Sequence, residues 1–370
     1  MLTGASKELT MLGKAAAEYA RKELAIDRQE NDKYPFGSFF DSALSKAFEI
    51  DLFHTILPEA LGGMDQGMCA LCVIMDNVCQ VDGSLGGIIF TNAFAQEIIL
   101  NANDPALLQP IVSSATDVKE YLLACPIFNN PADVEPDVEA VKEDGKYVLN
   151  GKCEYLVLGG FAAHAVIPAK IHGQAGYSLF LLDLSDRQVT KSEPVLSLGF
   201  HACPAIDLAL NCTKSILIGE EGQGNAYFSG AGDSMFVAAA AISMGIMKGA
   251  YKEALEYSQE RFQGGREIIN WSEIRMILAN MALKIKIAEM AIVQACRAVD
   301  QMVADWRQCS RAAALSVAEM ACEVTTDGIQ VLGGVGYMED YGQAKRYRDA
   351  KQAQSLLGIT PMKKLRYLNS

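Results

Sequence analysis

The spacing of apolar residues changes twice along this chain of 370 residues, and the order of those changes is the strongest constraint on its fold. Residues 6–108 carry mostly helical spacing, broken by turn residues at Pro35 and at Pro58-Glu-Ala-Leu-Gly-Gly63. Residues 120–219 consist of short β-prone runs, and helical spacing returns from residue 225 onward. The sequence therefore predicts helices, then a small β region, then a helical bundle.

The predicted domain boundaries follow these two changes of spacing. An N-terminal helical domain is expected over residues 1–118, a middle β domain over 119–224 and a C-terminal four-helix bundle over 225–370. Together they make a fold that is mainly α with a central β domain.

The β-prone segment contains one run with clear alternation. Ile206, Leu208 and Leu210 fall on one face of a predicted strand, with Asp207 and Ala209 on the other. An alternation of this kind is typical of an antiparallel strand with one buried face, whereas strands of a parallel core are apolar on both faces.

Long helices are predicted for the C-terminal part. The spacing predicts a helix of about 30 residues over Asp233–Phe262. Asn270-Trp-Ser-Glu273 matches a capping box at the start of a second helix. A third helix is expected over Ser310–Leu332, ending at Gly333 and Gly334.

The overall charge excludes some functional classes. There are 32 basic and 45 acidic residues, a formal net charge of −13, which argues against a nucleic-acid binder. The first residues lack the pattern of a secretion signal, and the apolar run Phe236–Ala250 is too short and too interrupted by Gly and Ser to span a membrane. The sequence therefore predicts a soluble, cytoplasmic protein.

The ten cysteines are interpreted as reduced thiols. Cys69 and Cys72 form a CxxC motif with Cys79 seven residues on, inside the apolar run Met68–Val81, so all three can point inward as small hydrophobic side chains. A zinc site would need a second cysteine pair, and the four histidines show no ligand spacing, so no metal site is expected. The chain also has no GxGxxG motif after a strand and no P-loop.

Several local motifs, in this order of regions, resemble the acyl-CoA dehydrogenase family over nearly the whole chain. Gln330-Val-Leu-Gly-Gly-Val-Gly-Tyr337 is similar to the family's QxxGGxGY, and Tyr347-Arg-Asp-Ala-Lys351 to its YRDAK. Arg261-Phe-Gln-Gly-Gly265 resembles RxQFG, with Gly264 in place of the Phe. Weaker matches are Pro58–Gly63, Asp82-Gly-Ser84, Leu149-Asn-Gly151 and Gly219–Gly224.

This resemblance implies a fold and a chemistry. It implies an N-terminal helical domain, an antiparallel barrel-like β domain and a C-terminal four-helix bundle, assembled as a tetramer. Members bind FAD and oxidise acyl-CoA thioesters at the α and β carbons. A carboxylate removes the α-proton, FAD accepts the β-hydrogen as hydride, and an electron-transfer flavoprotein takes up the electrons.

Both positions at which the family places its carboxylate base are apolar in this sequence. The glutamate of the family's YEGT motif corresponds to Leu357, and the alternative position on the long helix corresponds to Met235. Neither side chain can accept a proton. The Arg that usually follows on that helix is Phe236, which removes a cation from the expected ligand side.

The family's flavin contacts are unequally retained. By resemblance, the stretch that contacts the subunit's own flavin corresponds to Pro126-Ile-Phe128. The element that shields the flavin corresponds to Tyr155 and the two residues after it, which lack the usual hydroxyl group. Thr360 lies one position after the place where the family has a threonine. By resemblance, the residues that would reach the neighbouring subunit's FAD are kept, namely Arg261, Gln263, Gln330, Gly333 and Gly334.

Three hypotheses follow for the function. The first is a catalytically deficient subunit that completes the FAD site of an intact paralogue in a hetero-oligomer. The second is a self-sufficient acyl-CoA dehydrogenase or reductase, as a homo-oligomer, with an aspartate base chosen from Asp82, Asp233 and Asp340. The third is a non-redox interaction protein that has kept only the fold. Asp233 and Ser84 are also candidate substrate contacts, Ser84 with a helix N-cap as its alternative role.

Overall fold

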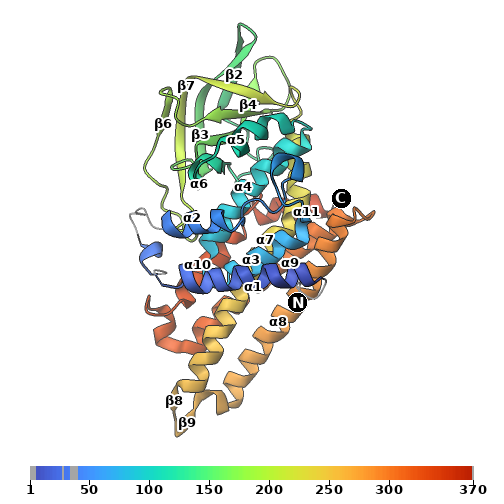
Figure 1. Cartoon of the computed structure of the whole chain (residues 1–370). Coiled ribbons are helices and arrows are strands. Elements are labelled where there is room, and N and C mark those ends of the chain that lie inside the picture. Colours follow the sequence, from blue (N-terminus) through green and yellow to red (C-terminus); the bar gives the residue numbers. More distant parts are fainter. Residues whose placement is uncertain (1–5, 27–28, 34–40, 369–370) are drawn as a thin grey trace.

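The computed structural model describes residues 6–26, 29–33 and 41–368, so the predicted turn at Pro35 lies outside the described residues. The β domain forms one end of the molecule, N-terminal helices cross its middle, and a long helical hairpin extends to the other end (Figure 1). The N-terminal helices are α1 (Lys7–Tyr19), α2 (Asp41–Glu49), α3 (Gly67–Val78), α4 (Gly83–Asn101), α5 (Leu108–Ser114) and α6 (Val118–Tyr121).

The strands close into a barrel, because β4 pairs in parallel with β2 and antiparallel with β5 at the two ends of the order β4-β2-β3-β7-β5. β1 extends β4 in parallel, and β6 pairs antiparallel with β7. The strands are β1 (Leu123–Ala124), β2 (Val138–Glu143), β3 (Lys146–Val157), β4 (His164–Ile171), β5 (Ser178–Asp183), β6 (Val189–Lys191) and β7 (Ala205–Ile218).

The prediction for the alternating strand is confirmed. Ile206, Leu208 and Leu210 lie buried on the inner face of β7, whereas Ala209 is exposed and Asp207 partly exposed. β7 pairs antiparallel with β3, β5 and β6. Gly151 on β3 has φ of +124°, and a Cβ there would lie 2.1 Å from the Asp137 carbonyl oxygen, so only glycine fits this tight crossing.

The C-terminal helices pack against one another as a bundle. They are α7 (Gly224–Glu260), α8 (Ser272–Asp300), α9 (Trp306–Leu332) and α10 (Gln343–Ala353), followed by α11 (Thr360–Leu368), which packs on α9. A two-stranded hairpin, β8 (Phe262–Gln263) and β9 (Arg266–Glu267), joins α7 to α8 at the far end of the molecule (Figure 1). The predicted class, mainly α with a central β domain and a C-terminal helical bundle, is confirmed, while the exact domain boundaries stay predictions.

Two predicted helix starts in this part differ from the structure. α7 begins at Gly224, nine residues before Asp233, because the burial of Phe228 and Ala231 stabilises a glycine-containing first turn that has weak helix propensity. The capping box at 270–273 is wrong: no side chain caps α8, and the Ser272 hydroxyl instead donates to Glu273. The end of α9 at Leu332 is as predicted, with Gly333 at φ of +64°.

Two helices in the described part, α4 and α7, are long and apolar enough to span a bilayer by length and composition alone. The prediction that this part of α7 is too short was therefore wrong. In α4, 89% of the most apolar window is buried inside the protein, and in α7 the share is 83%. Burial by neighbouring helices explains the apolar composition, since helices at the centre of a domain are apolar on all sides.

A buried ion network joins the N-terminal helices to α10. Lys345 Nζ lies 2.6 Å from Asp349 Oδ2 and 3.3 Å from Asp82 Oδ1, and all three side chains are almost fully buried. Asp82 also accepts the Ser84 N–H at 2.7 Å as the N-cap of α4, and Asp349 accepts the Phe200 N–H at 2.8 Å. One lysine therefore pairs with two carboxylates that fix three separate segments of the chain.

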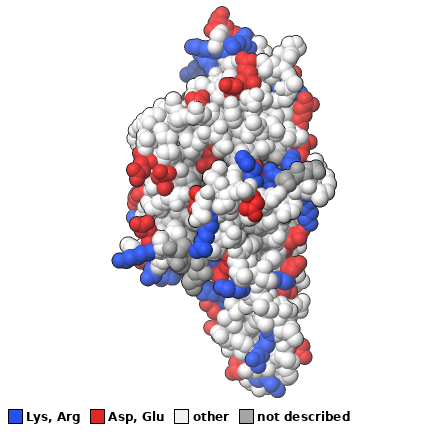
Figure 2. Space-filling model, turned by 90° about the vertical axis from the view of Figure 1, so that its right-hand side faces the viewer, with Lys and Arg blue, Asp and Glu red and all other residues white. Residues whose placement is uncertain are grey.

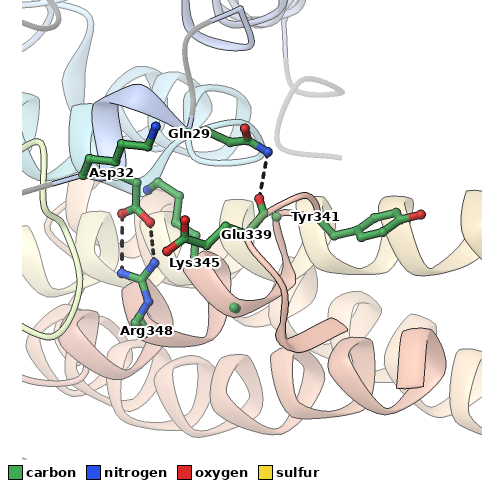
Figure 3. Close-up of a pocket in the computed structure, with 9 residues that line it drawn as sticks. Gln29, Asp32, Glu339, Tyr341, Lys345 and Arg348 are labelled. Carbon is green, nitrogen blue, oxygen red and sulfur yellow. Dashed lines mark hydrogen bonds and ion pairs between the residues drawn. The ribbon is translucent and has the colours of Figure 1, made fainter. Parts of the chain in front are cut away.

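A second, more exposed set of contacts lies beside this network. Arg348 pairs with Asp32, and the Gln29 amide donates to the Glu339 carbonyl oxygen at 2.8 Å (Figure 3). Arg348 therefore fixes α10 against the N-terminal segment through Asp32, whereas Asp349 fixes it against the loop before β7.

Replacing Lys345 with methionine is expected to lower the free energy of unfolding by about 3–5 kcal/mol, because two buried carboxylates lose their common cation. Urea denaturation followed by circular dichroism measures the loss. Lys351→Met on the same helix is the control, since Lys351 is exposed and reaches only Gln354. A loss no larger than in the control would contradict a stabilising role for the network.

Candidate functional site

The loop after α10 carries Leu357, which stands where the family resemblance places a glutamate. Leu357 is buried and has φ of +61°, a left-handed conformation, and Gly358 follows at +112°. The Leu357 N–H donates to the Ile127 carbonyl oxygen at 2.7 Å. The loop is therefore held against the start of the β domain through its backbone and not through the side chain at 357.

Lys363 of α11 fixes the same loop from its other side. Its Nζ donates to the carbonyl oxygens of Gln354 at 2.7 Å and of Leu356 at 2.9 Å. Burial, assisted by the nearby Arg366 guanidinium, lowers the pKa of Lys363 to about 8. A neutral amine still has two hydrogens, so it can keep both bonds after it loses a proton.

A pocket of about 440 Å³ opens between this loop and the bundle. Leu357 and Phe236 contribute apolar surface, and Asp233, Arg311 and Lys363 contribute charge. Met235, the other candidate position for a base, is fully buried in the core and does not line this pocket. The two predicted positions are therefore both apolar and buried, but of the two only Leu357 lines this pocket.

Asp233 is the one acidic side chain among the pocket's lining residues, and it is paired. Arg311 Nη2 lies 2.7 Å from its Oδ1, and Arg307 Nε lies 3.4 Å from its Oδ2. Burial raises the pKa of Asp233, and the two arginines oppose that rise. Burial is the larger effect, so the pKa of Asp233 stays above its ordinary value, while the two arginines occupy the carboxylate oxygens that would accept a proton.

The other acidic and hydroxyl candidates have structural partners. Asp82 is the α4 N-cap and an ion partner of Lys345, so the alternative in which Ser84 is the N-cap is wrong. The Ser84 hydroxyl is buried and accepts the Ala202 N–H at 3.3 Å. Asp340 is exposed in the turn before α10.

A second pocket, of about 820 Å³, lies at the far end of the bundle and brings together most residues assigned to a neighbour's FAD. Arg261 and Gln263 reach it from the α7–α8 hairpin, and Gln330 and Gly333 from the end of α9. Gly334 is the next residue, with open space where a Cβ would stand. We call this group, with Tyr257 and Trp271 beside it, the Arg261 pocket.

The Arg261 pocket has the features of a site for a phosphate-bearing group. The Arg261 side chain is exposed and has no ion-pair partner among the described residues. Gly333 adopts φ of +64° and ψ of −138°, a backbone that only glycine adopts readily. A free guanidinium fork next to an unobstructed backbone suits a pyrophosphate, so these residues fit the nucleotide part of FAD.

Tyr155 and Thr360, the candidate contacts to the chain's own flavin, do not line the Arg261 pocket. The Tyr155 ring packs edge-on against Phe128 with centroids 5.6 Å apart, and its backbone has φ of +58°. The Thr360 hydroxyl donates to the Gln354 carbonyl oxygen at 3.2 Å at the start of α11. Both side chains therefore have contacts within the chain.

Charge is mixed over the surface. On the face in Figure 2, basic and acidic side chains alternate from the β domain to the tip of the bundle. Among the described residues, no group of three or more His, Cys, Asp or Glu side chains is arranged to hold a metal ion.

Comparison with known proteins identifies the family. Residues 6–109 match the model of the acyl-CoA dehydrogenase N-terminal domain, and residues 222–364 match that of the acyl-CoA dehydrogenase C-terminal domain. Together the two models cover two thirds of the chain. The chain belongs to the acyl-CoA dehydrogenase family.

Two curated relatives match over almost the whole chain. Cyclohex-1-ene-1-carbonyl-CoA dehydrogenase of Syntrophus aciditrophicus is 25% identical over 362 residues, covering 95% of this chain and 85% of the relative. A subunit of the caffeyl-CoA reductase-Etf complex of Acetobacterium woodii is 26% identical over 360 residues, covering 94% of this chain and 93% of the relative.

Solved structures share the fold over almost the whole of this chain. A chain from the structure described as the electron transferring flavoprotein of Acidaminococcus fermentans has a TM-score of 0.91 at 25% identity and covers 99% of this chain and 98% of that one. Acyl-CoA dehydrogenase from Bacillus anthracis, complexed with FAD, has a TM-score of 0.88 at 20% identity and covers 99% of this chain and 67% of that one. Members of this family bind FAD.

The sequence did not single out Arg311 or Lys363. A lone arginine or lysine in a helix is usually a surface charge, and Lys363 is followed by the exposed Lys364, which pairs with Glu319. The sequence offered one indication: consecutive residues of a helix point in different directions, so Lys363 and Lys364 could not both face solvent in the same way.

Lys363→Met is expected to remove a pH dependence of stability. The pKa of Lys363 lies near 8 in the folded chain and near 10.4 in an unfolded one, so between these values the unfolded chain binds more protons and stability rises with pH. The wild type should therefore gain about 2 kcal/mol relative to the variant from pH 7 to pH 10. Urea denaturation at both pH values measures it.

The matched control is Lys364→Met, which removes an exposed lysine from the same helix and should leave the pH dependence unchanged. A constant difference between the wild type and Lys363→Met at both pH values would mean that Lys363 titrates normally.

Proposed function

We propose that this chain is an FAD-linked acyl-CoA dehydrogenase-family subunit that lacks its own carboxylate base and completes the flavin site of an intact paralogue in a hetero-oligomer. The observation that carries the proposal is a contrast between two sites. The cavity where a base is needed is bordered by Leu357 and by an aspartate already paired with arginines. The Arg261 pocket, by contrast, keeps a free cation and an open glycine backbone.

The chemistry explains why the first site is deficient. The α C–H bond of an acyl thioester is very weakly acidic, so a base has to lie within reach of it in a water-excluded pocket. FAD supplies the acceptor for the hydride when it is bound. In this chain Leu357 and Phe236 supply apolar surface but cannot hold a proton, so neither can act as the base.

The Arg261 pocket would bind the FAD of a partner subunit. Its residues come from the α7–α8 hairpin and from the end of α9, and the hairpin extends away from the β domain, where a second subunit could reach it (Figure 1). There Arg261 would hold a pyrophosphate by bidentate hydrogen bonds, and Gln263 and Gln330 would supply amide donors and acceptors.

A second function is favoured by one observation: Asp233 lines the same pocket as Leu357. In a self-sufficient dehydrogenase or reductase, an acyl group entering that pocket would meet Asp233 as the base, after Arg311 had moved away or had been shared with the substrate. The tight contact to Arg311 makes this the weaker proposal.

Electron-transfer flavoprotein is the proposed redox partner of the complex. The relative from Acetobacterium woodii is named as a subunit of a reductase-Etf complex, which supports this assignment. Acyl-CoA is the proposed substrate of the complex, and a cytoplasmic location stays a prediction.

Expressed alone, the chain is expected to purify without yellow colour and without acyl-CoA oxidation. Co-expressed with a paralogue from the same genome that has the YEGT glutamate, it should yield a yellow, active complex. Flavin absorbance near 450 nm and dye reduction by a panel of acyl-CoA thioesters measure both. Tight FAD binding and activity in the lone chain would contradict the proposal and favour Asp233. A colourless complex with every paralogue would instead support the non-redox interaction protein.

Within the co-expressed complex, Arg261→Ala should weaken FAD binding about 10- to 100-fold, the size expected for a lost charge-assisted hydrogen bond. Flavin retained after dialysis, titrated back with FAD, gives the affinity. Arg275→Ala removes an equally exposed arginine from the start of α8 and serves as the control. Equal affinities in the two variants would rule out a phosphate contact by Arg261.

A further inference from the structure

The CxxC motif on α3 meets a third cysteine from the bundle. Cys69 lies in the first turn of α3, and Cys72 lies one turn later. Cys296, near the end of α8, places its Sγ 3.0 Å from Cys69 Sγ. Two thiols more than 220 residues apart in sequence are therefore in contact.

Asp300 fixes the two helices at this point. Its carboxylate accepts the Met68 N–H at 2.6 Å and the Cys69 N–H at 3.0 Å, which caps the start of α3 with the last residue of α8. These bonds hold Cys69 and Cys296 in register. The contact between the thiols is thus a consequence of helix docking, and the sequence spacing of Cys69 and Cys72 gave no sign of it.

The three thiols differ in access to solvent. Cys69 is partly exposed, whereas Cys72 and Cys296 are buried. A small solute can therefore reach Cys69 first, with Cys296 directly behind it. A disulfide bond of about 2.05 Å would need the two sulfur atoms to approach by about 1 Å, a movement within the range of side-chain rotation.

We propose that Cys69 and Cys296 form a reversible disulfide that links α3 to α8. The oxidant is a small disulfide such as oxidised glutathione. The Cys69 thiolate attacks it and releases one thiol, and Cys296 then attacks the Cys69 sulfur and releases the second. The two protein thiols lose two electrons and two protons, and the oxidant becomes two thiols.

The surroundings make this exchange slow. The Cys296 thiol, burial and Asp300 all raise the pKa of the Cys69 thiol, so little thiolate is present near neutral pH. The cross-link therefore forms over hours of oxidising conditions and not as part of each catalytic cycle. The inference does not depend on the proposed function, because none of these residues lines the Leu357 or Arg261 pockets.

The test uses the full-length chain, reduced and then incubated with oxidised glutathione at pH 8. After denaturation and alkylation, Cys69 and Cys296 should both be protected from the alkylating reagent, whereas both are alkylated in the reduced chain. Non-reducing peptide mapping should find the Cys69 and Cys296 peptides joined, and dithiothreitol should separate them.

Variants locate the link. Cys69→Ser and Cys296→Ser should each lose the Cys69–Cys296 peptide pair. Cys212→Ser, which alters an exposed cysteine on β7, is the control and should leave the link intact. Ten remaining thiols, or glutathione attached to Cys69 with no link to Cys296, would overturn the proposal. The wild-type peptide map decides the question even if a variant fails to fold.

Discussion

The buried cation of Lys345 is the interaction on which the arrangement of the three regions depends. It lies between Asp82, which begins α4, and Asp349, which binds the backbone before β7. A buried carboxylate that has lost its cation costs free energy, so displacing α10, which carries Lys345 and Asp349, would leave Asp82 without its cation and the segment before β7 without its carboxylate partner. The N-terminal helices, the β domain and α10 are consequently fixed by a single ammonium group.

The order of regions could be predicted because each region has its own apolar period. The alternation in β7 survives in the structure since one face of that strand covers the barrel interior and the other meets solvent. The end of α9 could be predicted because Gly333 requires a conformation that other residues avoid. These signals are local, and they depend on no contact with distant residues.

The parts that could not be predicted depend on distant contacts. The start of α7 lies in a glycine-containing segment that becomes helical only because Phe228 packs against the core. Likewise, Leu357 and Met235 look equivalent as the predicted positions of a base, yet only Leu357 of the two lines the pocket beside Asp233. Arg311 and Lys363 complete that cavity, and no short-range pattern separates them from surface cations.

The loop at Leu357 is shaped by groups other than the side chain it presents. Its carbonyl oxygens are held by Lys363 and its N–H by Ile127, and the left-handed conformation persists at a residue that gains nothing from it. The backbone conformation at 357 is therefore set by these hydrogen bonds, while the Leu357 side chain adds its own burial in the core. Two sets of contacts thus support one residue, and the backbone bonds would remain if its side chain were changed.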